Sequence, residues 1–229
     1  MSSLNLVSLL HLCDPALPIG SFSHSAGLET YVQADIVNSA ETAKQFITNQ
    51  LSFNLFYTDA ALVSLAYDAM VEDNLSEVLE LDALCNAVKL PKEIRVASNK
   101  LALRLLKIFD NNDEARRAKE YRQAIIDRNG YGHYCIAFAL LAVDLGIEKD
   151  EALTGFYYNA TSGFVTNAVK LIPLGQQTGQ EILLSLLPLI NELAGKTLYP
   201  DETLIGYSCA GFDIRSMQHE QLYSRLYMS

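Results

Sequence analysis

The chain has 229 residues and a formal net charge of −10, from 17 basic and 27 acidic side chains. Half of its residues are hydrophobic and its mean hydropathy is +0.11, which supplies a sizeable core and excludes a wholly disordered chain. The negative charge argues against a nucleic-acid-binding protein, because such a protein needs basic side chains to neutralise phosphates.

The sequence also lacks the marks of a membrane or secreted protein. Its most apolar run, from Ile136 to Val143, is far shorter than the roughly 20 residues of a transmembrane helix. The first residues carry no basic stretch of the kind that begins a signal peptide. The cysteines are widely spaced, without a Cys-x-x-Cys pair: Cys13, Cys85, Cys135 and Cys209. We therefore expect a cytoplasmic protein with reduced thiols and no membrane segment.

The first unusual segment, residues 12–29, reads L-C-D-P-A-L-P-I-G-S-F-S-H-S-A-G-L-E. Pro15 and Pro18 fix their own φ angles and restrict the residues before them, while Gly20 can adopt a conformation closed to other residues. A serine at 21 or 23 can then cap a helix that begins near His24. These features predict a stiff corner between two helices.

The same segment permits a second interpretation, a small hydrolase that uses Ser23 or Ser25 as nucleophile and His24 as base. Such a nucleophile needs a third group that orients the base and an oxyanion hole, and the sequence indicates neither. The nucleophile elbow of hydrolases also needs a strand before the turn, whereas strand signals are poor here. The hydrolase in the 20–29 loop is therefore the alternative to a structural corner.

Helix-capping patterns follow along the chain. Asn38 is followed by a glutamate three residues later, and Asn74 repeats the pattern, so both are predicted to cap helices. A third helix is predicted to begin near Pro91, because apolar residues recur there at helical spacing and proline is tolerated at a helix start.

The next helical patterns lie nearer the C-terminus. If residues 152–171 form a helix, five residues share one face: Phe156, Ala160, Gly163, Asn167 and Lys170. Small residues on that face allow another backbone to approach closely, and Lys170 there needs a carboxylate or water; the alternative is an ordinary surface lysine. Residues 182–193 form another helical stripe, which Pro188 is predicted to bend and which ends near Gly195.

No run of residues alternates apolar and polar in the manner of a strand. The breaks between helical patterns are too short to be linkers. We therefore predict an all-α fold, a single-domain bundle of about eight to ten helices over residues 1–229.

Motifs for nucleotide or metal chemistry are weak. The segment at 173–180, P-L-G-Q-Q-T-G-Q, has two glycines but lacks the Lys-Ser/Thr of a P-loop, so the chain is not expected to hydrolyse nucleotides unaided. The pairs His11-x-Cys13 and His133-x-Cys135 resemble metal ligands. On a helix, however, side chains two residues apart point about 200° away from each other, which favours structural residues. A metal-storage module remains a third interpretation.

The C-terminal segment, residues 214–229, is apolar on nearly every side when drawn as a helix. Such a segment cannot bury all of its apolar side chains on one surface. It either inserts into the core of its own chain or orders against another chain. Arg215 and Arg225 are suited to bind carboxylates of either surface.

Three segments closely resemble the UreF family of urease accessory proteins: residues 12–29, residues 168–180 (A-V-K-L-I-P-L-G-Q-Q-T-G-Q) and residues 216–229 (S-M-Q-H-E-Q-L-Y-S-R-L-Y-M-S). Residues 133–147 fit the same family in position and character. The resemblance runs from about residue 6 to the last residue, and its C-terminal motif is highly specific.

The resemblance implies an all-α, non-catalytic chaperone that forms a homodimer and binds the accessory protein UreD, called UreH in some species. The two proteins would recruit the GTPase UreG, and the assembly would insert nickel into apo-urease in a GTP-dependent step. Nickel would be handled by the complex, and the chain itself would bind no stable cofactor.

The resemblance also implies site residues. Partner binding would involve Glu29, Tyr31, Lys170, His219, Glu220, Tyr223 and Arg225, the last four in the C-terminal tail. Tyr158 matches an aromatic residue at the family's dimer interface. Thr154 stands in that interface where some relatives place an arginine, whose ion pair a threonine cannot form. Gly211 stands where many members have proline.

Overall fold

The computed structural model describes residues 3–20, 24–25, 27–207, 210–222 and 225–227. Within these ranges every regular element is a helix and no strand occurs. The elements are α1 (Ser3–Leu12), α2 (Leu28–Gln33), α3 (Ala40–Asn49), η2 (Gln50–Ala60), α4 (Ala61–Val71), α5 (Leu75–Val88), α6 (Lys92–Ile108), α7 (Arg116–Ile126), α8 (Tyr134–Asp144), α9 (Lys149–Leu171), α10 (Gln176–Thr197), η3 (Glu202–Leu204) and α11 (Ala210–His219).

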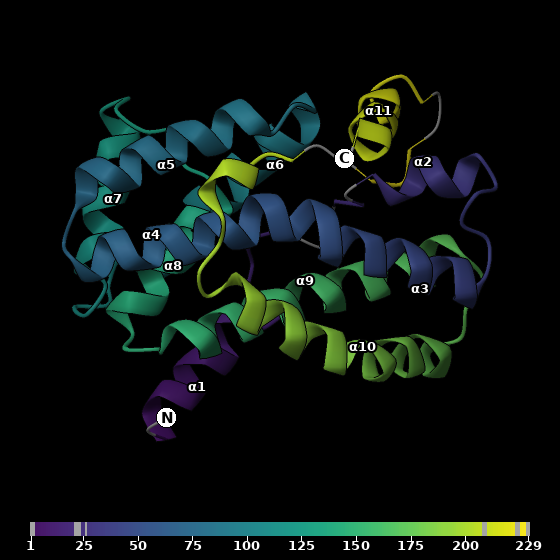
Figure 1. Ribbon diagram of the computed structural model, residues 1–229, viewed down its shortest axis with the longest axis horizontal. Coiled ribbons are helices and arrows are strands. Elements are labelled where there is room, and N and C mark those ends of the chain that lie inside the picture. Colours follow the sequence, from purple (N-terminus) through teal and green to yellow (C-terminus); the bar gives the residue numbers. More distant parts are fainter. Residues whose placement is uncertain (1–2, 21–23, 26, 208–209, 223–224, 228–229) are drawn as a thin grey trace.

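The π-helical segment η2 joins α3 to α4 without a break, so the three form one long rod across the molecule (Figure 1). Counted in this way, the described residues form ten continuous helices and one short 3₁₀ turn. This confirms the predicted all-α bundle. The rod is packed against α9 and α10 along one side, and α4 also contacts α5 and α8. None of the helices in the described ranges is long and apolar enough to cross a membrane.

Helix α8 is the centre of the core. Every side chain from Cys135 to Ala142 is buried, and α8 packs against α4, α6, α7 and α9. This explains why the most apolar run of the sequence lacks an amphipathic pattern: a helix surrounded by other helices has no polar face.

The helix starts confirm two sequence predictions and correct one. Asn74 caps α5 by accepting the backbone N–H of Glu77 at 3.2 Å, and α6 begins directly after Pro91. Helix α3, however, is capped by Ser39 instead of Asn38. The Ser39 hydroxyl accepts the N–H of Thr42, whose own hydroxyl accepts the N–H of Ser39, so the capping box lies one residue later than predicted.

Helix α10 runs from Gln176 to Thr197, with Pro188 inside it, so it contains the apolar stripe predicted at 182–193 and begins six residues before that stripe. Helix α9 spans the predicted face at 152–171 and extends it by three residues at its start. The π-helical geometry of η2, by contrast, has no counterpart among the sequence predictions.

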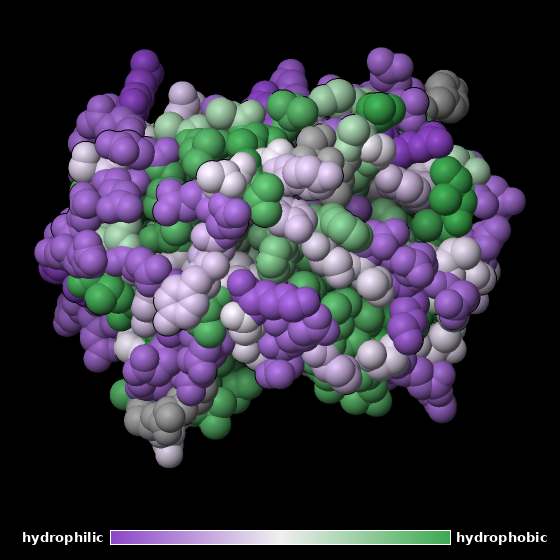
Figure 2. Space-filling model, viewed as in Figure 1, coloured by the Kyte–Doolittle hydropathy of each residue, from purple (hydrophilic) through white to green (hydrophobic). Residues whose placement is uncertain are grey.

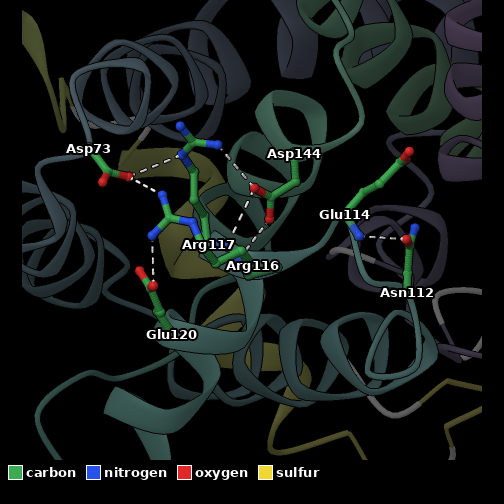
Figure 3. Close-up of polar contacts among 8 residues, drawn as sticks. Asp73, Asn112, Glu114, Arg116, Arg117, Glu120 and Asp144 are labelled. Atoms are coloured by element: carbon green, nitrogen blue, oxygen red, sulfur yellow. Dashed lines mark hydrogen bonds and ion pairs between the residues drawn. The ribbon is translucent and has the colours of Figure 1, made fainter.

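The start of α7 is capped by a side chain from another helix. Its N-cap residue, Ala115, has no side chain for this purpose, and the carboxylate of Asp144 at the end of α8 accepts the N–H of Ala118 at 2.9 Å (Figure 3). Arg117 lies 3.4 Å from the same carboxylate and 3.3 Å from Asp73. Burial raises the pKa of Asp144, although these donors act in the opposite direction. The contacts tie three helix ends together.

The corner at residues 14–20 is held by local hydrogen bonds and by one contact with α6. The Asp14 side chain accepts the N–H of Ala16 at 2.7 Å between Pro15 and Pro18, and Gly20 adopts a φ of 85°, in the left-handed region. Arg104 of α6 donates to the carbonyl of Ile19 at 2.9 Å, which fixes the corner to the body of the protein.

The predicted helix start near His24 is wrong, because α2 begins only at Leu28. Gly27 precedes it with a φ of 79°, a conformation that ends a helix or lies outside one. A Cβ at Gly27 would lie 2.7 Å from the Ser216 hydroxyl and 3.1 Å from the Phe212 ring. The glycine therefore allows α11 to approach closely. The two serines predicted as caps, 21 and 23, lie outside the described residues.

Candidate functional site

The C-terminal segment lies on the body of the protein beside α2 and α6 (Figure 1). Helix α11 directs three residues inward, where they are buried: Phe212, Ser216 and His219. The chain then turns, and Tyr227 is also buried. The sequence allowed two arrangements of this segment, insertion into the core of its own chain or packing against another chain. In this single chain, one face of the segment packs against its own body.

A buried carboxylate lies at the centre of this packing. Glu29, in the first turn of α2, is only 2% exposed. Its oxygens accept the backbone N–H of Leu226 at 2.8 Å and that of Tyr227 at 3.2 Å. Nε2 of His219 lies 3.2 Å from the same carboxylate. Glu29 thus binds the end of the chain through main-chain groups as well as a side chain.

A second carboxylate completes the site. Glu93, in the first turn of α6, lies 2.7 Å from Nδ1 of His219 and accepts a hydrogen bond from Arg225 at 2.7 Å. Both ring nitrogens of His219 therefore face carboxylate oxygens. The two carboxylates lie in the first turns of α2 and α6, where the helix dipole favours a negative charge. We call these four side chains the tail clasp: Glu29, Glu93, His219 and Arg225.

The outer face of the same segment remains uncovered. Ile214 and Met217 of α11 and Leu226 beyond it are all exposed, Leu226 to 78%. The same segment also carries Arg215, which is partly buried, and Glu220, which is exposed. Apolar side chains on a segment held by a few polar contacts form a surface suited to another protein.

A cavity of about 290 Å³ lies below the tail. Its wall combines segments that are far apart in sequence, including Pro15 of the corner, His24 and Phe212 of α11. Four of the five residues predicted to share a face of α9 line it: Phe156, Ala160, Gly163 and Asn167. Asn167 also donates to the carbonyl of His24 at 2.8 Å. Through Asn167, that face of α9 therefore contacts the segment of its own chain that contains His24.

The remaining α9 residues lie on the surface. Lys170 is exposed in the last turn, where a positive charge is favourable to the helix dipole. Tyr158 is 43% exposed, and Thr154 is exposed with its hydroxyl donating to the carbonyl of Asp150. All three are accessible, so they stay candidates for contacts with other chains.

Tyr31 and Tyr223 complete the predicted partner-binding set. The Tyr31 ring packs edge-to-face on Phe46, with centroids 5.1 Å apart, and is therefore partly in the core. Tyr223 lies outside the described residues. Of the predicted set, the structure brings together Glu29, His219 and Arg225, and it leaves Lys170 apart from them.

Sequence reasoning missed Glu93 and Gly27. Glu93 is the one acidic residue in an otherwise basic helix, and that contrast was the available signal. Gly27 lies in the corner motif, but only its contact with α11 explains its presence.

The geometry gives no support to the hydrolase interpretation. Ser25 is fully buried, so its hydroxyl cannot meet a substrate carbonyl. Burial, together with Lys100 and Arg104, lowers the pKa of His24. Its backbone carbonyl is held by Asn167, in the wall of the cavity. The other candidate nucleophile, Ser23, lies outside the described residues.

The two His-x-Cys pairs do not converge on a metal site. His11 is exposed and packs against Phe109, whereas His133 is buried beside Ser98, 3.1 Å from its hydroxyl. Over the ranges that the structure describes, no group of three or more His, Cys, Asp or Glu residues could hold a metal ion.

Comparison with known proteins identifies the family. The family model of UreF matches residues 37–187. Proteins named "Urease accessory protein UreF" from Actinobacillus pleuropneumoniae and Haemophilus influenzae are each 46% identical, over 224 and 225 residues respectively. The chain belongs to the UreF family of urease accessory proteins.

These matches extend beyond the family model. The alignments cover 98% of this chain, with 99% of the Actinobacillus relative and 96% of the Haemophilus one. A relative from Bacillus sp. (strain TB-90), with the same name, is 36% identical over 225 residues, which are 98% of this chain and 99% of that protein. The resemblance of this chain to UreF proteins therefore includes the corner and the C-terminal segment.

Proposed function

We propose that this UreF-family chain is a non-catalytic adaptor in urease maturation. It binds a UreD/UreH-like accessory protein through the outer face of its C-terminal segment, and the pair recruits a UreG-like GTPase. The assembly then inserts nickel into apo-urease in a GTP-dependent step in the cytoplasm, with nickel handled by the complex and no cofactor bound stably to this chain.

The observation that carries this proposal is the two-sided character of the C-terminal segment. The tail clasp holds one face, while Ile214, Met217 and Leu226 present apolar surface to solvent. Methionine and arginine are enriched at protein interfaces, where a few central side chains supply most of the binding energy. The clasp gives the segment a defined shape before the partner arrives, which reduces the entropic cost of binding.

The exposed side of α9 supplies the candidate contacts for a homodimer and for the GTPase-bearing partner. Tyr158 and Thr154 are accessible on this helix, in keeping with a homodimer contact, and Lys170 lies near its end as a candidate contact for the GTPase-bearing partner. Aromatic residues such as Tyr158 are enriched at the centres of such interfaces.

A double variant of the outer face tests the partner contact. We expect Ile214→Asp/Met217→Asp to lower the affinity for the UreD/UreH-like protein at least about tenfold, because each charge would have to be buried on binding. Both residues are exposed, so the thermal unfolding temperature should change little. Co-purification and a binding titration measure the effect.

The matched control is Leu184→Asp, since Leu184 is equally apolar and exposed but lies on α10. It should bind the partner like the unaltered protein. Unchanged binding by the double variant would remove the C-terminal segment from the partner interface. Phosphate release from GTP by the purified chain alone would contradict a non-catalytic adaptor.

A further inference from the structure

Two cysteines meet in the core, away from the partner surface. Cys85 of α5 and Cys135 of α8 are both fully buried, and their sulfur atoms lie 3.6 Å apart. Sulfur atoms in a disulfide are about 2 Å apart, so a bond requires them to approach by roughly 1.6 Å. Cys13 is only partly buried and Cys209 lies outside the described residues.

The surroundings make the two sulfurs chemically unequal. Burial acts to raise the pKa of Cys85, but the hydrogen bond with Cys135 and the positive charge of Lys89 lower it below the ordinary value. Burial and the neighbouring Cys85 raise the pKa of Cys135. Cys85 is therefore the more readily ionised of the two sulfurs, and its thiolate form is a nucleophile 3.6 Å from a second sulfur.

The wall of the cavity includes a residue one helical turn from Cys85. This residue is Lys89, which directly follows α5, and its ion-pair partner Asp59 also lines the cavity. Because neither sulfur is exposed, a bulky reagent cannot reach them in the folded protein. Hydrogen peroxide is far smaller, and the cavity wall at Lys89 is the entry route that we infer for it.

We propose that Cys85 and Cys135 are an oxidative modification site that hydrogen peroxide converts to a disulfide. The Cys85 thiolate attacks one peroxide oxygen, the O–O bond breaks, and the departing hydroxide takes the thiol proton of Cys135 to become water. The Cys135 thiolate then attacks the sulfenic sulfur of Cys85, forming the S–S bond and releasing hydroxide. This hydroxide takes up the proton that Cys85 lost on ionising. Two thiols and one peroxide thus give a disulfide and two waters, with two electrons passing from sulfur to oxygen.

The bond would tie α5 to the central helix α8 across 50 residues of sequence. Closing a loop of this length restricts the unfolded chain, so the oxidised protein should unfold at a higher temperature than the reduced protein. It would also remove the thiolate next to Lys89, leaving Asp59 as the counter-charge of that lysine.

Mass spectrometry of the full chain tests this site. Fully reduced protein is treated with a small excess of hydrogen peroxide, and its intact mass is measured. We expect most molecules to lose 2 Da, peptide mapping to join Cys85 to Cys135, and dithiothreitol to restore the original mass. Cys13→Ser is the matched control and should lose 2 Da like the unaltered chain, whereas Cys135→Ser should not.

The unaltered protein also provides a test that needs no variant. After peroxide treatment, alkylation in denaturant should label Cys13 but leave Cys85 and Cys135 unlabelled. Oxidised glutathione, which is too large for the buried pair, should leave both sulfurs open to alkylation. A cross-link to Cys13 or Cys209, oxygen addition without a 2 Da loss, or a glutathione adduct on Cys85 would overturn the proposal.

Discussion

Glu29 combines burial with three donors from the end of the chain, the ring of His219 and the amides of Leu226 and Tyr227. Two of these donors belong to the backbone, so the contact depends on the path of the segment more than on its side chains. A buried carboxylate is stable only when such donors replace the water that it has lost. Glu29 and the C-terminal segment therefore depend on each other.

Glu29→Gln should loosen the end of the chain while preserving its shape. The amide nitrogen of glutamine places hydrogens where the carboxylate accepted them, and leaving such buried donors unsatisfied costs about 1–3 kcal/mol. We expect the backbone amides of Leu226 and Tyr227 to exchange their hydrogens about ten to a hundred times faster. Hydrogen-exchange mass spectrometry of the C-terminal peptide measures this. Glu220→Gln, an exposed change in the same segment, is the control, and equal protection in both variants would contradict the role of Glu29.

At the scale of elements, α2 shows how a short helix can be positioned by its neighbours. It has six residues and contacts α11 on one side and α9 on another. A helix of this length is unstable alone. Its position depends on Gly27, whose missing side chain lets the Phe212 ring and the Ser216 hydroxyl lie against the backbone.

Gly27→Ala should displace α11 from α2. The new methyl group would lie 2.7 Å from Ser216 Oγ and 3.1 Å from the Phe212 ring, and alanine also pays about 1 kcal/mol or more for the left-handed backbone. We expect a lower thermal unfolding temperature and faster proteolysis after α11. Gly211→Ala is the control, because no atom lies within 4 Å of its added Cβ and alanine favours the helix by about 1 kcal/mol. Similar behaviour of the two variants would show that α11 does not depend on this contact.

Among the structural elements, those fixed by residues close in sequence were predictable, and contacts between distant segments were not. The start of α6 and the cap of α5 depend on residues close in sequence, such as Pro91 and Asn74, and local patterns reveal them. The shift of the α3 cap to Ser39 reflects competition between adjacent capping boxes. The tail clasp joins Glu29 to a residue 190 positions away, and no local periodicity encodes such a pair. The family resemblance named Glu29, His219 and Arg225, but only the fold shows that Glu29 binds His219 and that Glu93 binds both His219 and Arg225.

At the scale of the whole molecule, one buried ion pair links two parts of the core. Nζ of Lys89, the residue after α5, lies 2.6 Å from Oδ2 of Asp59 on η2, and both side chains are at most 15% exposed. A single hydrophobic cluster surrounds these elements. Because a domain with one core unfolds cooperatively, the loss of one charge of this pair affects the stability of the whole protein.

Lys89→Met should cost about 3–5 kcal/mol of unfolding free energy at pH 7, because it leaves the Asp59 charge buried and unpaired. Replacing both residues, as in Asp59→Leu/Lys89→Met, should recover most of the loss. Lys196→Met, which breaks an exposed pair with Glu192, should cost no more than about 1 kcal/mol and is the control. Urea unfolding followed by circular dichroism measures all three. A double variant as unstable as the single one would contradict this account.

The pH dependence of the same variants separates charge from packing. Burial acts to raise the pKa of Asp59, but Lys89 lowers it below the ordinary value of 3.8. The carboxylate therefore adds stability above pH 3.8, and this stability is lost as the pH falls through the lower pKa of the folded protein. In Lys89→Met the largest influence that lowers this pKa is lost, and His133 and Thr58 alone oppose burial. Asp59 therefore takes up a proton at a higher pH than in the unaltered protein, and its buried charge disappears. The deficit of Lys89→Met should consequently shrink between pH 7 and pH 4, whereas a deficit caused by lost packing alone would stay constant.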